Sequence, residues 1–183
     1  LQKKKLNYKI RIKNIDHKSN LNNLNSAYLN VLNVDFNQKR PFEKITTKSN
    51  NYIFKCFDIS IKLLKKKKII GLINCPIKKE TLFKKNHQGI TEYLSKKLNK
   101  NGNEVMLIYN KKLSVCPVTT HIPLQQVSKK IKKSIIIKKI KTINYFYKKF
   151  LNTKPKFAVL GLNPHNFTYL KNSEEDQVIS KAI

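Results

Sequence analysis

Residues 156–165, KFAVLGLNPH, decide how this chain is expected to fold. The apolar run 157–162 has the composition of a short buried strand, and the Asn-Pro-His that follows is typical of a turn. In open α/β sheets, ligands bind at the carboxyl ends of the strands. His165 therefore stands at a position where binding or catalytic residues are expected. A lone histidine can instead bond only to its own loop, and both interpretations stay open at this point.

A second stretch, residues 113–121, follows the same pattern. Its sequence, LSVCPVTTH, is an apolar run that ends in two threonines and His121. Because the carboxyl ends of neighbouring parallel strands meet at one sheet edge, we expect His121 and His165 to reach the same crevice.

Hydrophobic periodicity predicts the remaining elements as an alternation of strands and helices, which indicates an α/β fold. Strands are expected at 8–15, 27–36, 69–73, 105–109, 113–119 and 157–162. Helices are expected at 49–67, 92–98 with Thr91 as cap, 123–133, 134–151 and 173–183 with Ser173 as cap. The acidic residues 174–176 are interpreted as first-turn charge rather than as metal ligands.

The net charge of +29 raises the question of nucleic-acid binding. Arg11 and Arg40 are the only arginines among the 39 basic residues, whereas base and phosphate recognition depends strongly on arginine. The lysines are spread along the whole chain together with many Asn and Ile residues, a combination that A/T-rich codons produce. A lysine-rich nucleic-acid-binding module therefore remains the non-enzyme alternative.

Cysteine usage and hydropathy bear on the compartment. Cys56, Cys75 and Cys116 are odd in number and lack CxxC spacing, which favours a reducing, cytoplasmic environment. The apolar runs are much shorter than the roughly 20 residues that a membrane helix needs. The chain begins at Leu1 and ends inside a predicted helix, so we expect a fragment of a longer protein.

Four segments in order carry a family resemblance: GLINCPIKK at 71–79, GITEYL at 89–94, VTTHIPL at 118–124 and LGLNPH at 160–165. Together they resemble the 4-hydroxythreonine-4-phosphate dehydrogenase family, the PdxA family of pyridoxine biosynthesis. TTHIPL and GLNPH are the specific pieces. On this basis, residues 1–183 are expected to be a partial PdxA-like region that lacks an N-terminal segment and the C-terminal part of the family fold.

The resemblance implies a three-layer α/β/α fold with a mixed sheet, like isocitrate and isopropylmalate dehydrogenases. It implies a cytoplasmic homodimer that uses NAD and a divalent metal (zinc, magnesium or cobalt), with neither nucleic acid nor membrane as partner. The reaction would be oxidation and decarboxylation of 4-phosphooxy-L-threonine. Carried over by motif, His121 and His165 are two of three histidine ligands of the metal, and Thr91 binds the substrate phosphate. No residue is assigned as catalytic.

Two departures from the family pattern leave alternatives open. Ile90 stands where the family has a phosphate-binding histidine, and nearby His87 is a possible substitute. Residues 166–168, Asn-Phe-Thr, replace the family's Ala-Gly-Glu after NPH. The chain also stops before the family's third metal histidine. A paralogue acting on another phosphorylated hydroxy acid and an inactive fragment are therefore the alternatives within this resemblance.

Overall fold

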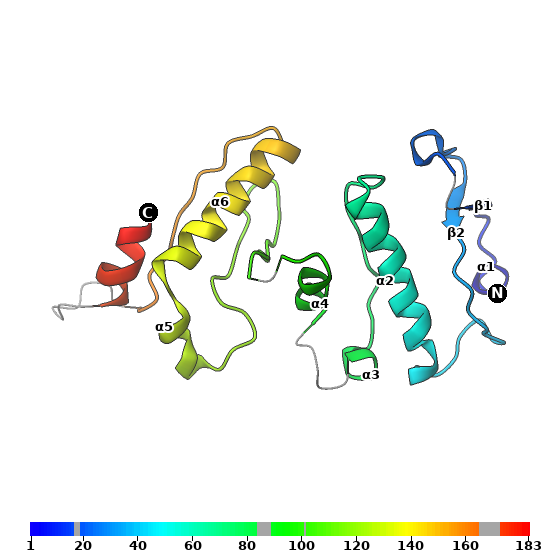
Figure 1. Ribbon diagram of the computed structural model, residues 1–183, viewed down its shortest axis with the longest axis horizontal. Helices are drawn as coiled ribbons and strands as arrows, with labels where there is room; N and C mark the ends of the chain where they lie inside the picture. Colours follow the sequence, from blue (N-terminus) through cyan, green and yellow to red (C-terminus); the bar gives the residue numbers. More distant parts are fainter. Residues whose placement is uncertain (17–18, 84–88, 101, 165–172) are drawn as a thin grey trace. The chain divides into compact units, whose positions relative to one another are not determined.

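The computed structural model describes residues 1–16, 19–83, 89–100, 102–164 and 173–183 (Figure 1). Its contacts divide the chain into two compact units, Leu1–Ile90 and Thr91–Ile183. Helices and strands both occur, which confirms the predicted mixed α/β class in its general form. Within the described part of the chain, no helix combines the length and hydropathy needed to span a bilayer.

The first unit contains a two-stranded parallel sheet. β1 (Ile12–Ile15) pairs with β2 (Leu29–Leu32) in a register that places Ile12 opposite Leu29. Parallel neighbours require a crossover connection of about a dozen residues, and the chain between the two strands has that length. Both predicted strands are confirmed, although each is shorter than its apolar pattern.

Helices make up most of the regular structure in both units (Figure 1). In the first unit they are α1 (Gln2–Lys5), the 3₁₀ turns η1 (Leu21–Asn23) and η2 (Thr47–Ser49), α2 (Asn50–Lys65) and α3 (Lys79–Phe83). They continue with α4 (Ile90–Lys97), the 3₁₀ turn η3 (Leu124–Gln126), α5 (Val127–Lys130), α6 (Lys133–Phe150), the π-helical turn η4 (Glu175–Ile179) and the 3₁₀ turn η5 (Ser180–Ala182).

The two long helices, α2 and α6, match the predictions for 49–67 and 134–151 within two residues. Phe57 and Ile61 form the buried face of α2, and Ile136 and Ile143 form that of α6. The first pair is four residues apart and the second seven, spacings that keep each pair on one side of its helix. The side chain of Asn50 ties α2 to α3 by donating from Nδ2 to the carbonyl of Thr81, at 2.9 Å.

A single hydrophobic cluster organises the C-terminal part of the second unit. Its buried members are Ile136 from α6, Ile179 from η4 and Ala182 from η5. Partly buried side chains pack around them: Val118, Ile131, Ile137, Ile140, Val159, Leu162 and Val178. The cluster therefore gathers residues from both of the histidine-bearing stretches singled out in the sequence.

Two of the predicted strands are wrong for this chain. Residues 69–73 and 157–162 form no strand in the structure, although both are apolar. Ile70 is 96% exposed, Ile73 98% and Leu160 83%. A strand exists only when a neighbour supplies backbone partners, and apolar composition does not provide that neighbour. The predicted strands 105–109 and 113–119 meet at one antiparallel bridge, between Ile108 and Val115.

Candidate functional site

His121 lies in the irregular segment that follows the Ile108–Val115 bridge, and its side chain is exposed. The two threonines before it, Thr119 and Thr120, are half-buried. An exposed imidazole beside partly buried chain is accessible to a ligand from solvent. His165, the second predicted metal ligand, lies outside the described residues, as does His87.

The backbone of His121 adopts the left-handed conformation, with φ of 55°. Among the described residues, other non-glycine residues with positive φ each stand two positions after the end of a helix, where such a conformation is common. They are Asn7, Lys67, Asn99 and Asn152. His121 has no helix before it that requires this conformation. Strained backbone of this kind is enriched at binding sites, which supports a functional interpretation.

The two motif segments are anchored in the same hydrophobic cluster. Val118 stands three residues before His121, and Leu162 stands three residues before His165. Both pack against the buried group Ile136, Ile179 and Ala182. The chain segments that lead into the two histidines therefore pack on one hydrophobic cluster, although neither segment is a regular strand.

Glu175 holds the beginning of the Asn-Pro-His turn. Its Oε1 accepts hydrogen bonds from the backbone N–H groups of Leu162 and Asn163, both at 2.8 Å. Its Oε2 accepts a third from the side-chain Nδ2 of Asn163, at 3.0 Å. The glutamate is 8% exposed, so these bonds satisfy a carboxylate that is nearly removed from water.

These hydrogen bonds also determine the charge state of Glu175. The backbone N–H of Asn163 first, then its side chain, lower the pKa of the carboxyl to about 2. Glu175 lies in the first turn of η4, as predicted, and its carboxylate also binds another segment. The capping role predicted for Ser173 is confirmed, since its Oγ accepts from the N–H of Asp176 at 3.2 Å.

The sequence did contain a signal for the role of Glu175. Residues 175, 179 and 182 lie four and three positions apart, so they share one helix face, and all three are buried. A charged residue in an otherwise apolar stripe must find a partner, because an unpaired buried carboxylate is costly.

Thr91, the predicted phosphate ligand, is exposed and is the second residue of α4. The helix begins at Ile90 rather than at residue 92, so the prediction that Thr91 caps it from outside is wrong by two positions. Ile90 is half-buried. A hydroxyl exposed in the first turn of a helix can join the free backbone N–H groups there in binding an anion.

A groove of about 630 Å³ runs along α6, between residues 110–118 and 155–160. It is lined largely by apolar side chains, and the hydroxyl of Tyr147 bonds to that of Ser114 across 2.8 Å. Burial raises the pKa of the Cys116 thiol on this wall, against the opposing effect of Lys139. A thiol with a raised pKa is a poor nucleophile, so Cys116 is interpreted as a packing residue.

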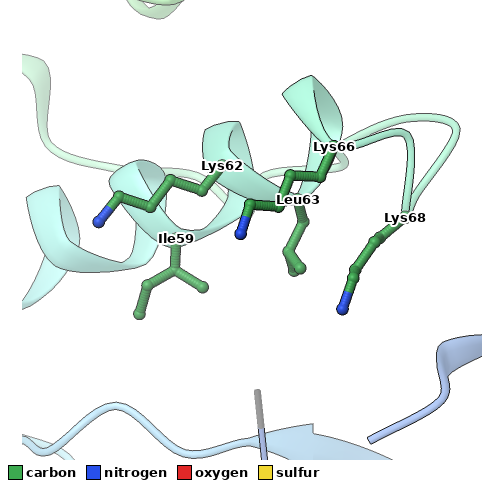
Figure 2. Close-up of a pocket in the computed structure, with 5 residues that line it drawn as sticks. All are labelled: Ile59, Lys62, Leu63, Lys66 and Lys68. Carbon is green, nitrogen blue, oxygen red and sulfur yellow. The ribbon is translucent and has the colours of Figure 1, made fainter. Parts of the chain in front are cut away.

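Lysines surround a smaller hollow, of about 370 Å³, on α2 (Figure 2). Ile59 and Leu63 form its apolar part, and Lys62, Lys66 and Lys68 extend beside them. Neither Thr91 nor His121, the predicted site residues that the structure describes, lines this hollow. The lysine run 65–68 is exposed at the end of α2, where its positive charge suits the negative end of the helix dipole.

The described residues do not by themselves complete a metal site. Over the ranges that the structure covers, no three His, Cys, Asp or Glu side chains come close enough together to hold an ion. His121 is therefore the one predicted metal ligand whose position is known. The prediction that it shares a metal with His165 stays a prediction.

Comparisons with known proteins bear on the whole chain. All of residues 1–183 match the family described as pyridoxal phosphate biosynthetic protein PdxA. A 4-hydroxythreonine-4-phosphate dehydrogenase of Sulfurihydrogenibium sp. is 38% identical over 128 residues, covering 68% of this chain and 39% of that protein. A D-threonate 4-phosphate dehydrogenase of Pectobacterium atrosepticum is 27% identical over 142 residues, covering 76% of this chain and 43% of that protein.

A solved structure shares the fold. The crystal structure of 4-hydroxythreonine-4-phosphate dehydrogenase from Klebsiella pneumoniae superposes with a TM-score of 0.74 at 24% identity, covering 96% of this chain and 55% of that one. The chain thus spans about half the length of the relatives it matches. From the match over its full length, and from the motifs around His121 and His165, this chain belongs to the PdxA family.

Proposed function

We propose that this chain is part of a dehydrogenase that oxidises 4-phosphooxy-L-threonine with NAD and a divalent metal, in pyridoxine and pyridoxal phosphate biosynthesis. The observation that carries the proposal is the family match over all 183 residues. The anchoring of both histidine motifs in one hydrophobic cluster supports it. Because the relatives are about twice as long, we expect this chain to be inactive by itself.

The proposed metal ligands are His121 and His165, and the ion would be zinc, magnesium or cobalt. Neutral imidazole suits zinc and cobalt, and the exposed ring of His121 is accessible to an ion. When bound, the metal would polarise first the alcohol oxygen and then the ketone oxygen of the substrate. A third ligand has to come from outside the two recognised motifs.

Thr91 is proposed to bind the substrate phosphate through its exposed hydroxyl. Holding the phosphate at the start of α4 would fix one end of the substrate and leave its secondary alcohol oriented toward the histidines. NAD, when bound, would supply the hydride acceptor for oxidation of this alcohol to a ketone. The product would be a β-keto acid, which can lose carbon dioxide.

The same proposal includes the finer features of the fold and the surroundings of the enzyme. The likeness to the Klebsiella structure supports a three-layer α/β/α arrangement with a mixed sheet. We propose that the longer protein is a cytoplasmic homodimer whose ligands are small phosphorylated molecules, rather than nucleic acid or membrane.

A second candidate substrate is another phosphorylated hydroxy acid, such as D-threonate 4-phosphate. Ile90 and the Asn-Phe-Thr at 166–168 motivate it, because both depart from the family's sequence within the motifs that carry its proposed site residues. Similarity to the Pectobacterium enzyme, whose name carries that substrate, supports keeping it as a candidate.

The two substrates can be compared directly by measuring NADH formation. The protein should include any coding sequence that flanks this chain, and it should be assayed with each substrate in turn, before and after chelation of metal. We expect chelator-sensitive NADH formation with 4-phosphooxy-L-threonine. A preference for D-threonate 4-phosphate would select the second candidate, and activity with neither substrate would contradict both.

A further inference from the structure

Glu175 links a helical turn to the segment that leads into His165. Three donors converge on its carboxylate, two from backbone and one from a side chain, and all three belong to Leu162 and Asn163. These two residues lie in irregular chain, so their N–H groups have no helix or sheet ladder to bind them. The carboxylate of Glu175 therefore supplies the hydrogen-bond acceptors that a helix or sheet would otherwise provide for these two N–H groups.

The turn that carries this glutamate is fixed by packing. Glu175 shares its helix face with Ile179 and Ala182, which are buried against Ile136 of α6. A carboxylate carried by a packed turn has little freedom to move, so it can define the position of the chain it binds. Leu162 packs on the same cluster, which restrains this segment by both polar and apolar contacts.

We propose that Glu175 is a positioning residue, whose carboxylate fixes the backbone of Leu162 and Asn163 and thereby the segment that leads into His165. The role of His165 as a metal ligand rests on the proposed function. Outer residues that orient metal ligands commonly change metal affinity about 10- to 100-fold when they are removed. Glu175 acts one step further out, through the backbone, and it does not touch the metal.

The test uses two readouts on the same variants. Hydrogen exchange at the Leu162 and Asn163 amides reports whether Glu175 holds the segment. Titration with Co²⁺ alone, followed by its absorption spectrum and by the imidazole NMR signals, reports on the ligand histidines. For Glu175→Ala, we expect exchange at both amides to accelerate on the order of tenfold or more. We expect Co²⁺ to bind roughly tenfold more weakly.

Two further variants separate positioning from general loss of structure. Glu174→Ala removes the adjacent acid, which accepts one 3.3 Å hydrogen bond from the side chain of Asn163, so both readouts should stay near the wild-type values. Glu175→Gln keeps an oxygen that can accept from both backbone amides, so it should restore most of the protection at Leu162 and Asn163. Circular dichroism checks that each variant retains the helical content of the wild type.

Each outcome has a distinct meaning. Unchanged exchange at Leu162 and Asn163 in Glu175→Ala would overturn the positioning role, whatever the metal does. Faster exchange with unchanged Co²⁺ affinity would overturn the proposed effect of Glu175 on metal binding by His165. If the wild-type protein binds no Co²⁺ at all, the proposed metal site itself fails and the link fails with it, while the exchange data still decide whether Glu175 holds the segment.

Discussion

Replacing Ile136 with alanine should destabilise the second unit by about 3 kcal/mol, because this side chain is the centre of the cluster that holds both motif segments. Ile136 is 3% exposed. The change removes three carbon groups, each worth ~0.8 kcal/mol when buried, and the cavity left behind adds to that transfer cost. The packed neighbours come from four separate segments, so the site cannot collapse completely around the smaller side chain.

The measurement is urea unfolding followed by circular dichroism, with hydrogen exchange in the second unit as a check that the transition belongs to it. Ile70→Ala makes the same chemical change at a position that is 96% exposed, and it should alter stability by less than about 0.5 kcal/mol. If Ile136→Ala costs less than about 1 kcal/mol, or no more than Ile70→Ala, the cluster does not hold the unit as described.

Three other predictions concern the site. His121→Ala and His165→Ala should each abolish metal-dependent NAD reduction in the longer protein. The double variant should be scarcely worse than either single variant, because ligands of one metal act as a unit. Full activity in either single variant would refute this. Ile90→His should lower the KM for 4-phosphooxy-L-threonine about tenfold through a charge-assisted bond to phosphate, and steady-state kinetics showing no gain would mean that another group fills that role or that the substrate differs. Because the pKa of Glu175 falls from 4.5 to about 2, its stabilisation should be fully present above pH 4.5 and lost as the pH falls toward 2. Unfolding of the wild type and of Glu175→Gln across this range should converge at the acid end, and a constant difference would contradict the assignment.

Local patterns predicted the helices well because a helix makes its hydrogen bonds within itself. The stripe in α6, from Ile136 to Tyr147, was sufficient to place that helix within a residue at each end. The strands were harder to predict, since residues 69–73 and 157–162 needed partners that no local pattern reveals. Apolar composition there identified segments suited to burial, without identifying what would pair with them.

For the candidate site too, the sequence predicted the residues in contiguous motifs but missed features that depend on distant partners. His121 could be found because its motif, TTHIPL, is contiguous in the sequence. Glu175 could be found only in part: its place in a stripe with Ile179 and Ala182 marks it as buried, but its partners lie 12 and 13 residues earlier in irregular chain. The left-handed backbone of His121 could not be predicted from the sequence, because only a small fraction of non-glycine residues adopt this conformation.

The exposed apolar segments have a consequence for handling the protein in solution. Residues 69–73 and 157–160 offer uncovered side chains of the kind that favours β-type aggregation between molecules. Lysines flank both stretches, at 65–68 before the first and at 154 and 156 before the second, where they act as charged gatekeepers. With a net charge of +29, mutual repulsion keeps copies apart at low ionic strength. Salt that screens this repulsion therefore removes the main barrier to self-association, so this chain stays dispersed best in dilute buffer.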